Sequence, residues 1–155
     1  MSKEVLLNQL KASKVYLDRA TNVLTEEDSA LCPTDGMMTA AQQIAHAAHT
    51  VEWFLEGVFG EGFDLDFEES TKIIFGVTSL TEARGWCTRA YAHALETIEG
   101  KSEEELNALT PEDSIMGATP IHVVLSGIVE HTAHHRGALS VYTRLLGKVP
   151  AMPYM

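Results

Sequence analysis

Apolar residues recur at intervals of three and four through four long segments of this chain, and that spacing constrains the fold more than any other feature of the sequence. Such a period places the apolar side chains on one face of an α-helix. The segments span about residues 3–25, 39–59, 79–100 and 119–146. Because no segment alternates apolar and polar residues as a half-buried strand does, we expect an all-α fold, a four-helix bundle.

Three of the four predicted helices begin with a recognisable start signal. The signals are a possible cap at Thr39, a capping box formed by Ser79 and Glu82, and the pair Thr119-Pro120. The start of each of these helices is therefore predicted to within about two residues.

The segment 60–78, which joins the second and third helices, is long for a small bundle. It is rich in glycine, acidic and aromatic residues and contains a short β-branched piece, Ile73-Ile74-Phe75. This length allows a crossover between helices rather than simple up-down order. Because long ordered connections are often functional, we expect residues 60–78 and the loop 107–118 to form the mouth of a site.

Composition and charge limit the possible partners. A chain of 155 residues suits one domain, 1–155, and its hydrophobic content of 45% supplies a core. The net charge of -11 argues against nucleic acid and against an anionic membrane surface as partners. The two cysteines form no CxxC pair, and neither a signal peptide nor a long apolar segment is evident, so we expect a cytoplasmic protein without a membrane span.

Six of the seven histidines fall in the segments 45–49 and 121–137. His131 and His135 are four residues apart, so on a helix they lie on one face and can chelate one ion. They also interrupt the apolar stripe of the fourth helix, where an imidazole without a partner is costly to bury. A divalent metal would satisfy both rings. The alternative is that the two rings hydrogen-bond to backbone groups or carboxylates.

A third ligand has to come from another helix. His46 is the best candidate, with His49, one turn later, in reserve. Three protein ligands leave coordination positions open, as in catalytic rather than structural zinc sites. A ferritin-like di-iron centre is not expected because no Glu-x-x-His occurs. Neither Cys32 nor Cys87 lies in a nucleophile motif, and we expect structural roles for both.

The order of residues in the fourth helix resembles a known family signature. The chain carries HTAHHRG at residues 131–137, then YTRLLG at 142–147 and a closing Val149-Pro150. These motifs resemble the C-terminal signature of the DinB/YfiT-like metalloenzymes, and IAH at 44–46, followed by Trp53, resembles the first histidine motif of that family. The resemblance covers both predicted metal-bearing helices and, in helix order and length, the whole chain.

The resemblance implies a bundle of up-down-down-up order, with a three-histidine site for zinc, nickel or a similar ion at His46, His131 and His135. It also implies a homodimer. Characterised members include thiol-dependent transferases and isomerases that use bacillithiol, mycothiol or glutathione, so a low-molecular-weight thiol is a possible cofactor. Two hypotheses follow: a metal-dependent enzyme that transfers a thiol to a small-molecule substrate or hydrolyses one, and a non-catalytic metal-binding or interaction module.

The sequence departs from the family pattern at two positions beside these motifs. Ala138 stands where the family has glutamine after Arg-Gly, and Glu130 stands where asparagine is frequent. The lost glutamine favours an altered substrate or lost catalysis. Around the three ligands, His49, Glu130 and His134 are candidates for orienting a ligand ring. Arg136 is a candidate either for binding an anionic group or for pairing with a carboxylate between helices.

Overall fold

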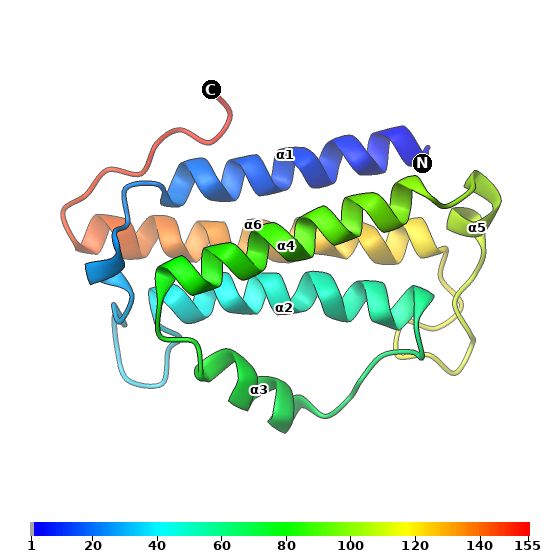
Figure 1. The fold of residues 1–155 in the computed structure, drawn as a ribbon, viewed down its shortest axis with the longest axis horizontal. Coiled ribbons are helices and arrows are strands. Elements are labelled where there is room, and N and C mark those ends of the chain that lie inside the picture. Colours follow the sequence, from blue (N-terminus) through cyan, green and yellow to red (C-terminus); the bar gives the residue numbers. More distant parts are fainter. Residues whose placement is uncertain (1) are drawn as a thin grey trace.

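The computed structural model describes residues 2–155 and consists of helices connected by loops. The helices are α1 (Lys3–Thr21), the 3₁₀ turn η1 (Glu26–Asp28), α2 (Ala40–Phe59), α3 (Phe67–Phe75), α4 (Leu80–Glu99), α5 (Glu103–Asn107) and α6 (Ile121–Leu145). The four long helices lie side by side, with α1 and α6 running in one direction and α2 and α4 in the other (Figure 1). The predicted all-α bundle of up-down-down-up order is confirmed.

Each long helix packs against two others: α2 against α4 and α6, and α1 against the same two. The core consists of the apolar faces predicted from the helical period, including Leu10, Ile44, Tyr91 and Leu125. Within residues 2–155, none of the helices combines the length and the apolar content that a membrane crossing requires.

A buried polar contact fixes the rotation of α6 about its axis. The Tyr91 hydroxyl of α4 lies 3.2 Å from Ser13 Oγ of α1 and 2.7 Å from Thr132 Oγ1 of α6. Because Thr132 is buried toward α1 and α4, its neighbours His131 and His135 are turned toward α2. Burial raises the pKa of Tyr91 to about 12, so its hydroxyl remains protonated at neutral pH.

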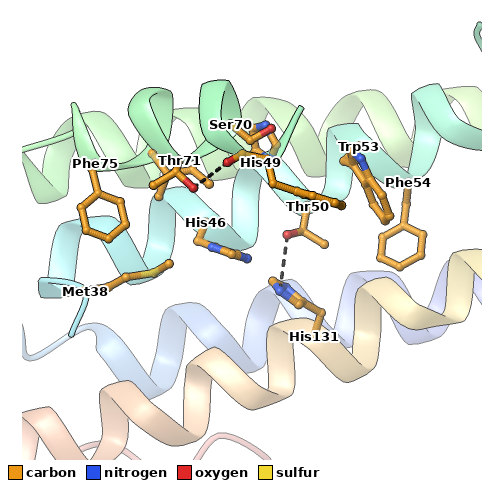
Figure 2. Close-up of a pocket in the computed structure, with 12 residues that line it drawn as sticks. Met38, His46, His49, Thr50, Trp53, Phe54, Ser70, Thr71, Phe75 and His131 are labelled. Atoms are coloured by element: carbon orange, nitrogen blue, oxygen red, sulfur yellow. Dashed lines mark hydrogen bonds between the residues drawn. The ribbon is translucent and has the colours of Figure 1, made fainter. Parts of the chain in front are cut away.

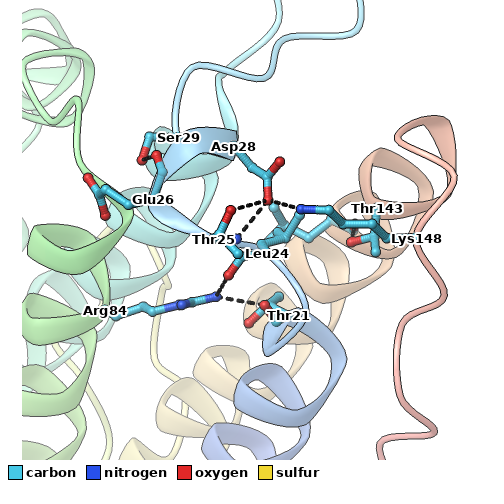
Figure 3. Close-up of polar contacts among 10 residues, drawn as sticks. Thr21, Leu24, Thr25, Glu26, Asp28, Ser29, Arg84, Thr143 and Lys148 are labelled. Atoms are coloured by element: carbon cyan, nitrogen blue, oxygen red, sulfur yellow. Dashed lines mark hydrogen bonds and ion pairs between the residues drawn. The ribbon is translucent and has the colours of Figure 1, made fainter.

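Helix α1 ends at Thr21, four residues before the predicted end at Thr25. The last carbonyl groups of a helix lack partners within the helix and need donors from elsewhere. Arg84 of α4 supplies one, because its guanidinium donates to the carbonyl oxygens of Thr21 and Leu24 (Figure 3). The apolar pattern of α1 could not predict this end of the helix, because the donor comes from a distant part of the chain.

Two acidic residues of η1 connect the loop after α1 to other parts of the fold. The Glu26 carboxylate accepts hydrogen bonds from the backbone N–H and the hydroxyl of Thr81, at the start of α4. The Asp28 carboxylate accepts from the backbone N–H of Thr25 and pairs with Lys148, beyond the end of α6. The loop after α1 is therefore held in two places, to the start of α4 and to the C-terminal segment.

The contact between Glu26 and Thr81 predicts a pH-dependent contribution to stability. Hydrogen bonds from Thr81, and then from Ser79, lower the pKa of Glu26 to about 2, below its value of about 4.3 in an unfolded chain. The ionised carboxylate therefore stabilises the fold above about pH 4.3, and the contribution is lost as the pH falls toward 2. We expect Glu26→Gln to lower the melting temperature by a few degrees at pH 7 and progressively less below pH 4. Thermal unfolding followed by circular dichroism measures this, with Glu27→Gln, at an exposed neighbour, as control. Equal shifts at every pH would contradict it.

The segment 60–78 differs most from the prediction, since nine of its residues form α3 rather than a loop with a β-branched piece. The Asp66 side chain caps this helix by accepting from the backbone N–H of Glu69. Ile74 is buried, and α3 packs on α2. Burial of this apolar side outweighs the weak strand preference of Ile73 and Ile74, because most helical stability in proteins comes from tertiary packing.

Two side chains of α2 hold the ends of this segment. Trp53 Nε1 donates to the carbonyl oxygen of Asp64 at 2.7 Å, and Gln42 Nε2 donates to that of Phe75 at 3.1 Å. The short helix α5 follows its cap at Ser102, and residues 109–120 form a loop with a bridge between Leu109 and Pro120. The sequence predicts Thr119 as the cap of α6 and Pro120 in its first turn, but Pro120 is the cap and the helix begins one residue later, at Ile121.

Candidate metal centre

Three imidazoles meet between α2 and α6, near the middle of the bundle. His46 comes from α2, and His131 and His135 come from successive turns of α6. One ring nitrogen from each lies within 4.8 Å of the others. His46 and His131 point toward each other across the space between the two helices (Figure 2). Of the two candidates on α2, the structure places His46 in this cluster.

The arrangement of His131 and His135 suits two ligands of one ion. Their Nε2 atoms lie 3.3 Å apart. Two bonds of about 2.0–2.1 Å at a tetrahedral angle place two imidazole nitrogens at about this separation. The spacing of four residues, which predicts a shared face, thus also produces a separation suited to chelation.

A chain of hydrogen bonds determines which nitrogen of His135 carries the proton. The Tyr142 hydroxyl donates to the Met38 carbonyl oxygen and accepts from Gln43 Nε2. Gln43 therefore presents Oε1 to His135 Nδ1, which must donate. The lone pair of His135 is then on Nε2, directed toward the cluster. This is the usual support for a histidine that binds metal, in which the second ring nitrogen is held by a polar neighbour.

Burial keeps the three rings neutral. Burial, and to a smaller extent the neighbouring imidazoles, lowers the pKa of His131 to about 4 and that of His135 to about 3. Burial also lowers the pKa of His46. At neutral pH the rings therefore keep the lone pairs that a metal ion requires.

The chemistry of the donor set indicates what the cluster can hold. His46 Nδ1 and His131 Nδ1 are buried and have no hydrogen-bond partner among the described residues. An ion bound at His131 Nε2 would leave His131 Nδ1 unpartnered, so these two atoms do not by themselves identify a ligand. A set of three neutral imidazoles suits zinc, nickel and similar divalent ions. The residues present therefore fit a divalent metal.

A cavity of about 290 Å³ adjoins the cluster on the side of α3 (Figure 2). Its residues are aromatic, apolar, hydroxyl-bearing or imidazole groups from α2 and α3, with one residue each from the loop before α2 and from α6. They are Met38, His46, His49, Thr50, Trp53, Phe54, Phe67, Ser70, Thr71, Ile74, Phe75 and His131. A second, more open depression reaches the same three histidines from the side of Met37 and His134. The cluster is thus approached from two sides.

The other histidines and Glu130 of the predicted site take different positions. His49 lines the cavity, with its ring edge toward Trp86 at 6.1 Å between centroids, and burial lowers its pKa. His134 is exposed and contacts the His135 ring at 5.1 Å between centroids. Glu130 is exposed and, within the described part of the chain, makes no hydrogen bond to the three histidines. The contact that orients His135 comes from Gln43 instead.

Arg136 lies away from the cluster. Its guanidinium carbon is 5.7 Å from the ring centroids of both Tyr16 and Tyr154, a geometry typical of cation–π contacts. Among the described residues it forms no ion pair, so the expected pairing with a carboxylate is wrong. Arg136 instead holds the C-terminal segment, through Tyr154, against α1 and α6. Ala138, the departure from the family pattern, is half-buried on α6.

Sequence reasoning missed two polar residues beside the cluster, Gln43 and Thr50. Thr50 Oγ1 lies 3.4 Å from His131 Nε2, and Gln43 supports His135. They lie three residues before and four residues after His46, which are the spacings of one helix face. A search for polar residues at helical spacing from His46 would have found both.

Removing the support of His135 should weaken metal binding. We expect Gln43→Leu to lower affinity for zinc about 10- to 100-fold, because the ring loses the acceptor that sets its tautomer and orientation. Competition with a chromophoric chelator measures the change. Gln9→Leu, on the exposed face of α1, is the matched control. Unchanged affinity in Gln43→Leu would show that packing alone orients the ring.

Comparison with known proteins agrees with this description. No curated protein matches the sequence. A crystal structure of a DinB-like protein from Bacillus cereus ATCC 10987 matches with a TM-score of 0.73 and 20% identity, over 95% of this chain and 94% of that one. At this identity the match shows the fold. The model of the DinB family matches residues 1–155, the whole length of the sequence. The protein therefore belongs to the DinB family.

Proposed function

We propose that this protein is a divalent-metal-dependent enzyme in which His46, His131 and His135 hold one ion, and that it transfers a thiol to a small substrate. The observation that carries the proposal is the cluster of three neutral imidazoles, with ligand atoms within 4.8 Å, beside a cavity. A purely structural ion would not need a cavity next to it. The preference for a thiol over water comes from the resemblance to thiol-dependent family members.

The residues around the cluster have separate tasks in this proposal. Gln43 and Tyr142 hold His135 in the tautomer that presents Nε2 to the ion. Thr50 contacts His131 and lies where the cavity meets the cluster. His46, His131 and His135 would hold the divalent ion, which would supply a Lewis acid that lowers the pKa of a bound thiol or water molecule.

Cobalt substitution tests the proposal, because the visible spectrum of Co²⁺ reports its ligands. We expect the cobalt-loaded protein to change its spectrum when azide or 2-mercaptoethanol is added, since both can occupy an open position. His131→Ala should show no such protein-bound cobalt spectrum. Consumption of the thiol in the presence of a small electrophile, compared with metal-free protein, then tests transfer.

Two outcomes would contradict the proposal. A cobalt spectrum insensitive to both azide and thiol would mean a closed site and would favour a non-catalytic metal-binding module. A spectrum that responds to both, with hydrolysis of esters or amides but no thiol transfer, would replace the transferase with a metal-dependent hydrolase.

A further inference from the structure

Three polar side chains of the cavity beside the metal centre are already hydrogen-bonded within the protein. Trp53 Nε1 donates to the Asp64 carbonyl oxygen, so the indole presents its apolar surface to the cavity. The Thr71 hydroxyl donates to the Phe67 carbonyl oxygen within α3 (Figure 2). Thr50 Oγ1 lies at hydrogen-bonding distance from His131. A ligand in this cavity is therefore offered hydrogen bonds mainly by the imidazoles and by the Ser70 hydroxyl.

The remaining surface of the cavity is apolar and largely aromatic. Phe54 and Trp53 form an edge-to-face pair at 5.3 Å between centroids, and Phe75 and Ile74 face them from α3. Gly127 of α6 allows the Phe54 ring to lie close, because a Cβ atom at that position would be 2.8 Å from Phe54 Cζ. Aromatic walls of this kind recognise rings and branched alkyl groups through contact area.

The size of the cavity limits what it can hold. An apolar protein cavity of about 150 Å³ is filled by benzene. The volume here is about 290 Å³, which leaves room for a benzene ring with a substituent or for a short branched alkyl chain. A whole tripeptide thiol would extend beyond this volume.

The electrostatic surroundings disfavour a charged ligand. All twelve lining residues are uncharged when their histidines are neutral, so in the metal-free protein a charged ligand would lose its water without gaining a counter-charge. The carboxylates of Glu52 and Asp64 lie close enough to His49 to act on its pKa, and the chain carries a net charge of -11. An anion would be disfavoured twice, by desolvation and by repulsion.

From these observations we propose that the cavity between α2, α3 and α6 binds an uncharged aromatic or branched aliphatic group of the substrate, with α3 as its roof. The inference rests on the proposed function, because it names the substrate class of that site. The polar part of the reaction then belongs to the second, open side of the cluster, near Met37 and His134.

The test uses three probes of one shape and different charge: 4-methylbenzyl alcohol, 4-methylbenzoate and 4-methylbenzylamine. Each is titrated into full-length protein, metal-free and zinc-loaded, carrying ¹³C-labelled isoleucine methyl groups. The Ile74 methyl signals report occupancy, since Ile74 is buried at the cavity. In the metal-free protein, we expect the alcohol to shift them saturably and to bind at least about tenfold more tightly than either charged probe.

A pair of variants on α3 locates the binding. Ser70→Trp places an indole into the cavity and should abolish the Ile74 shift, whereas Ile73→Trp, whose side chain does not line the cavity and is 48% exposed, should leave affinity within about twofold. Circular dichroism checks that both variants fold. If Ser70→Trp does not fold, nuclear Overhauser effects between the alcohol and the Ile74 methyl and Trp53 indole protons locate the probe in the wild-type protein.

Three results would overturn the inference: no saturable shift of Ile74, equal affinity for the charged probes, or retained binding in a folded Ser70→Trp variant. Because these results are judged on the metal-free chain, they are independent of the metal. A failed titration beside a responsive cobalt spectrum would remove the substrate class and leave the proposed enzyme standing. A successful titration beside an unresponsive cobalt spectrum would leave an apolar binding site without the proposed chemistry.

Discussion

His135→Ala is expected to reduce the metal content of the purified protein from about one ion per chain to background. His135 is the most buried of the three rings, at 5% exposure, and its lone pair is directed into the cluster by Gln43. Without it, two imidazoles remain, and the geometric match between His131 and His135 is lost. Chelation contributes much of the affinity of a site of this kind, so loss of one ligand has a large effect.

The measurement is elemental analysis of tag-free protein purified without chelator. His93→Ala is the matched control, because it removes an exposed imidazole from α4 and leaves the cluster untouched. His131→Ala should behave as His135→Ala does. If His135→Ala keeps its metal while the melting temperature falls, the ring has a structural role and the ligand assignment is wrong.

Leu125→Ala is expected to lower the free energy of unfolding of the metal-free protein by about 2–5 kcal/mol. Leu125 is fully buried on α6, in the core formed by the long helices. Truncation removes buried apolar area and leaves a cavity that the packed helices cannot close. A loss of this size is a large part of the stability of a domain of this length.

Denaturation by urea, followed by circular dichroism, measures the change. The matched control is Val123→Ala, two residues away on α6, where the side chain is 47% exposed and the change should stay within about 0.5 kcal/mol. Metal-free protein is used because a bound ion would add its own binding free energy to the folded state. Equal destabilisation by the two substitutions would show that α6 is not packed as described.

The helices that the sequence predicts well are those whose stability comes from a repeated local pattern. In α2, the cap at Thr39 and the apolar stripe through Ile44 lead to start and end points close to those observed. The spacing of His131 and His135 similarly predicts a shared face, since a helix alone determines it. His46 could be proposed but not chosen over His49, because that choice depends on how α2 is rotated against α6.

The features that sequence reasoning missed depend on contacts between distant residues. The early end of α1 depends on Arg84, which lies 63 residues beyond Thr21. Helix α3 has only nine residues and would be marginal alone, but it is stable where Ile74 is buried against α2. Its position then creates the cavity that we propose to hold the substrate.

The sequence by itself therefore determined the helical class, the order of the long helices through its family resemblance, and the pair of histidines one turn apart on α6. Only the tertiary structure decided that His46 completes the cluster, that Gln43 sets the tautomer of His135, and that an apolar cavity adjoins them. The physical reason is the range of the interactions. A helical period and an i, i+4 pair are local, whereas a site whose three histidines come from two helices depends on the angles and rotations at which those helices pack.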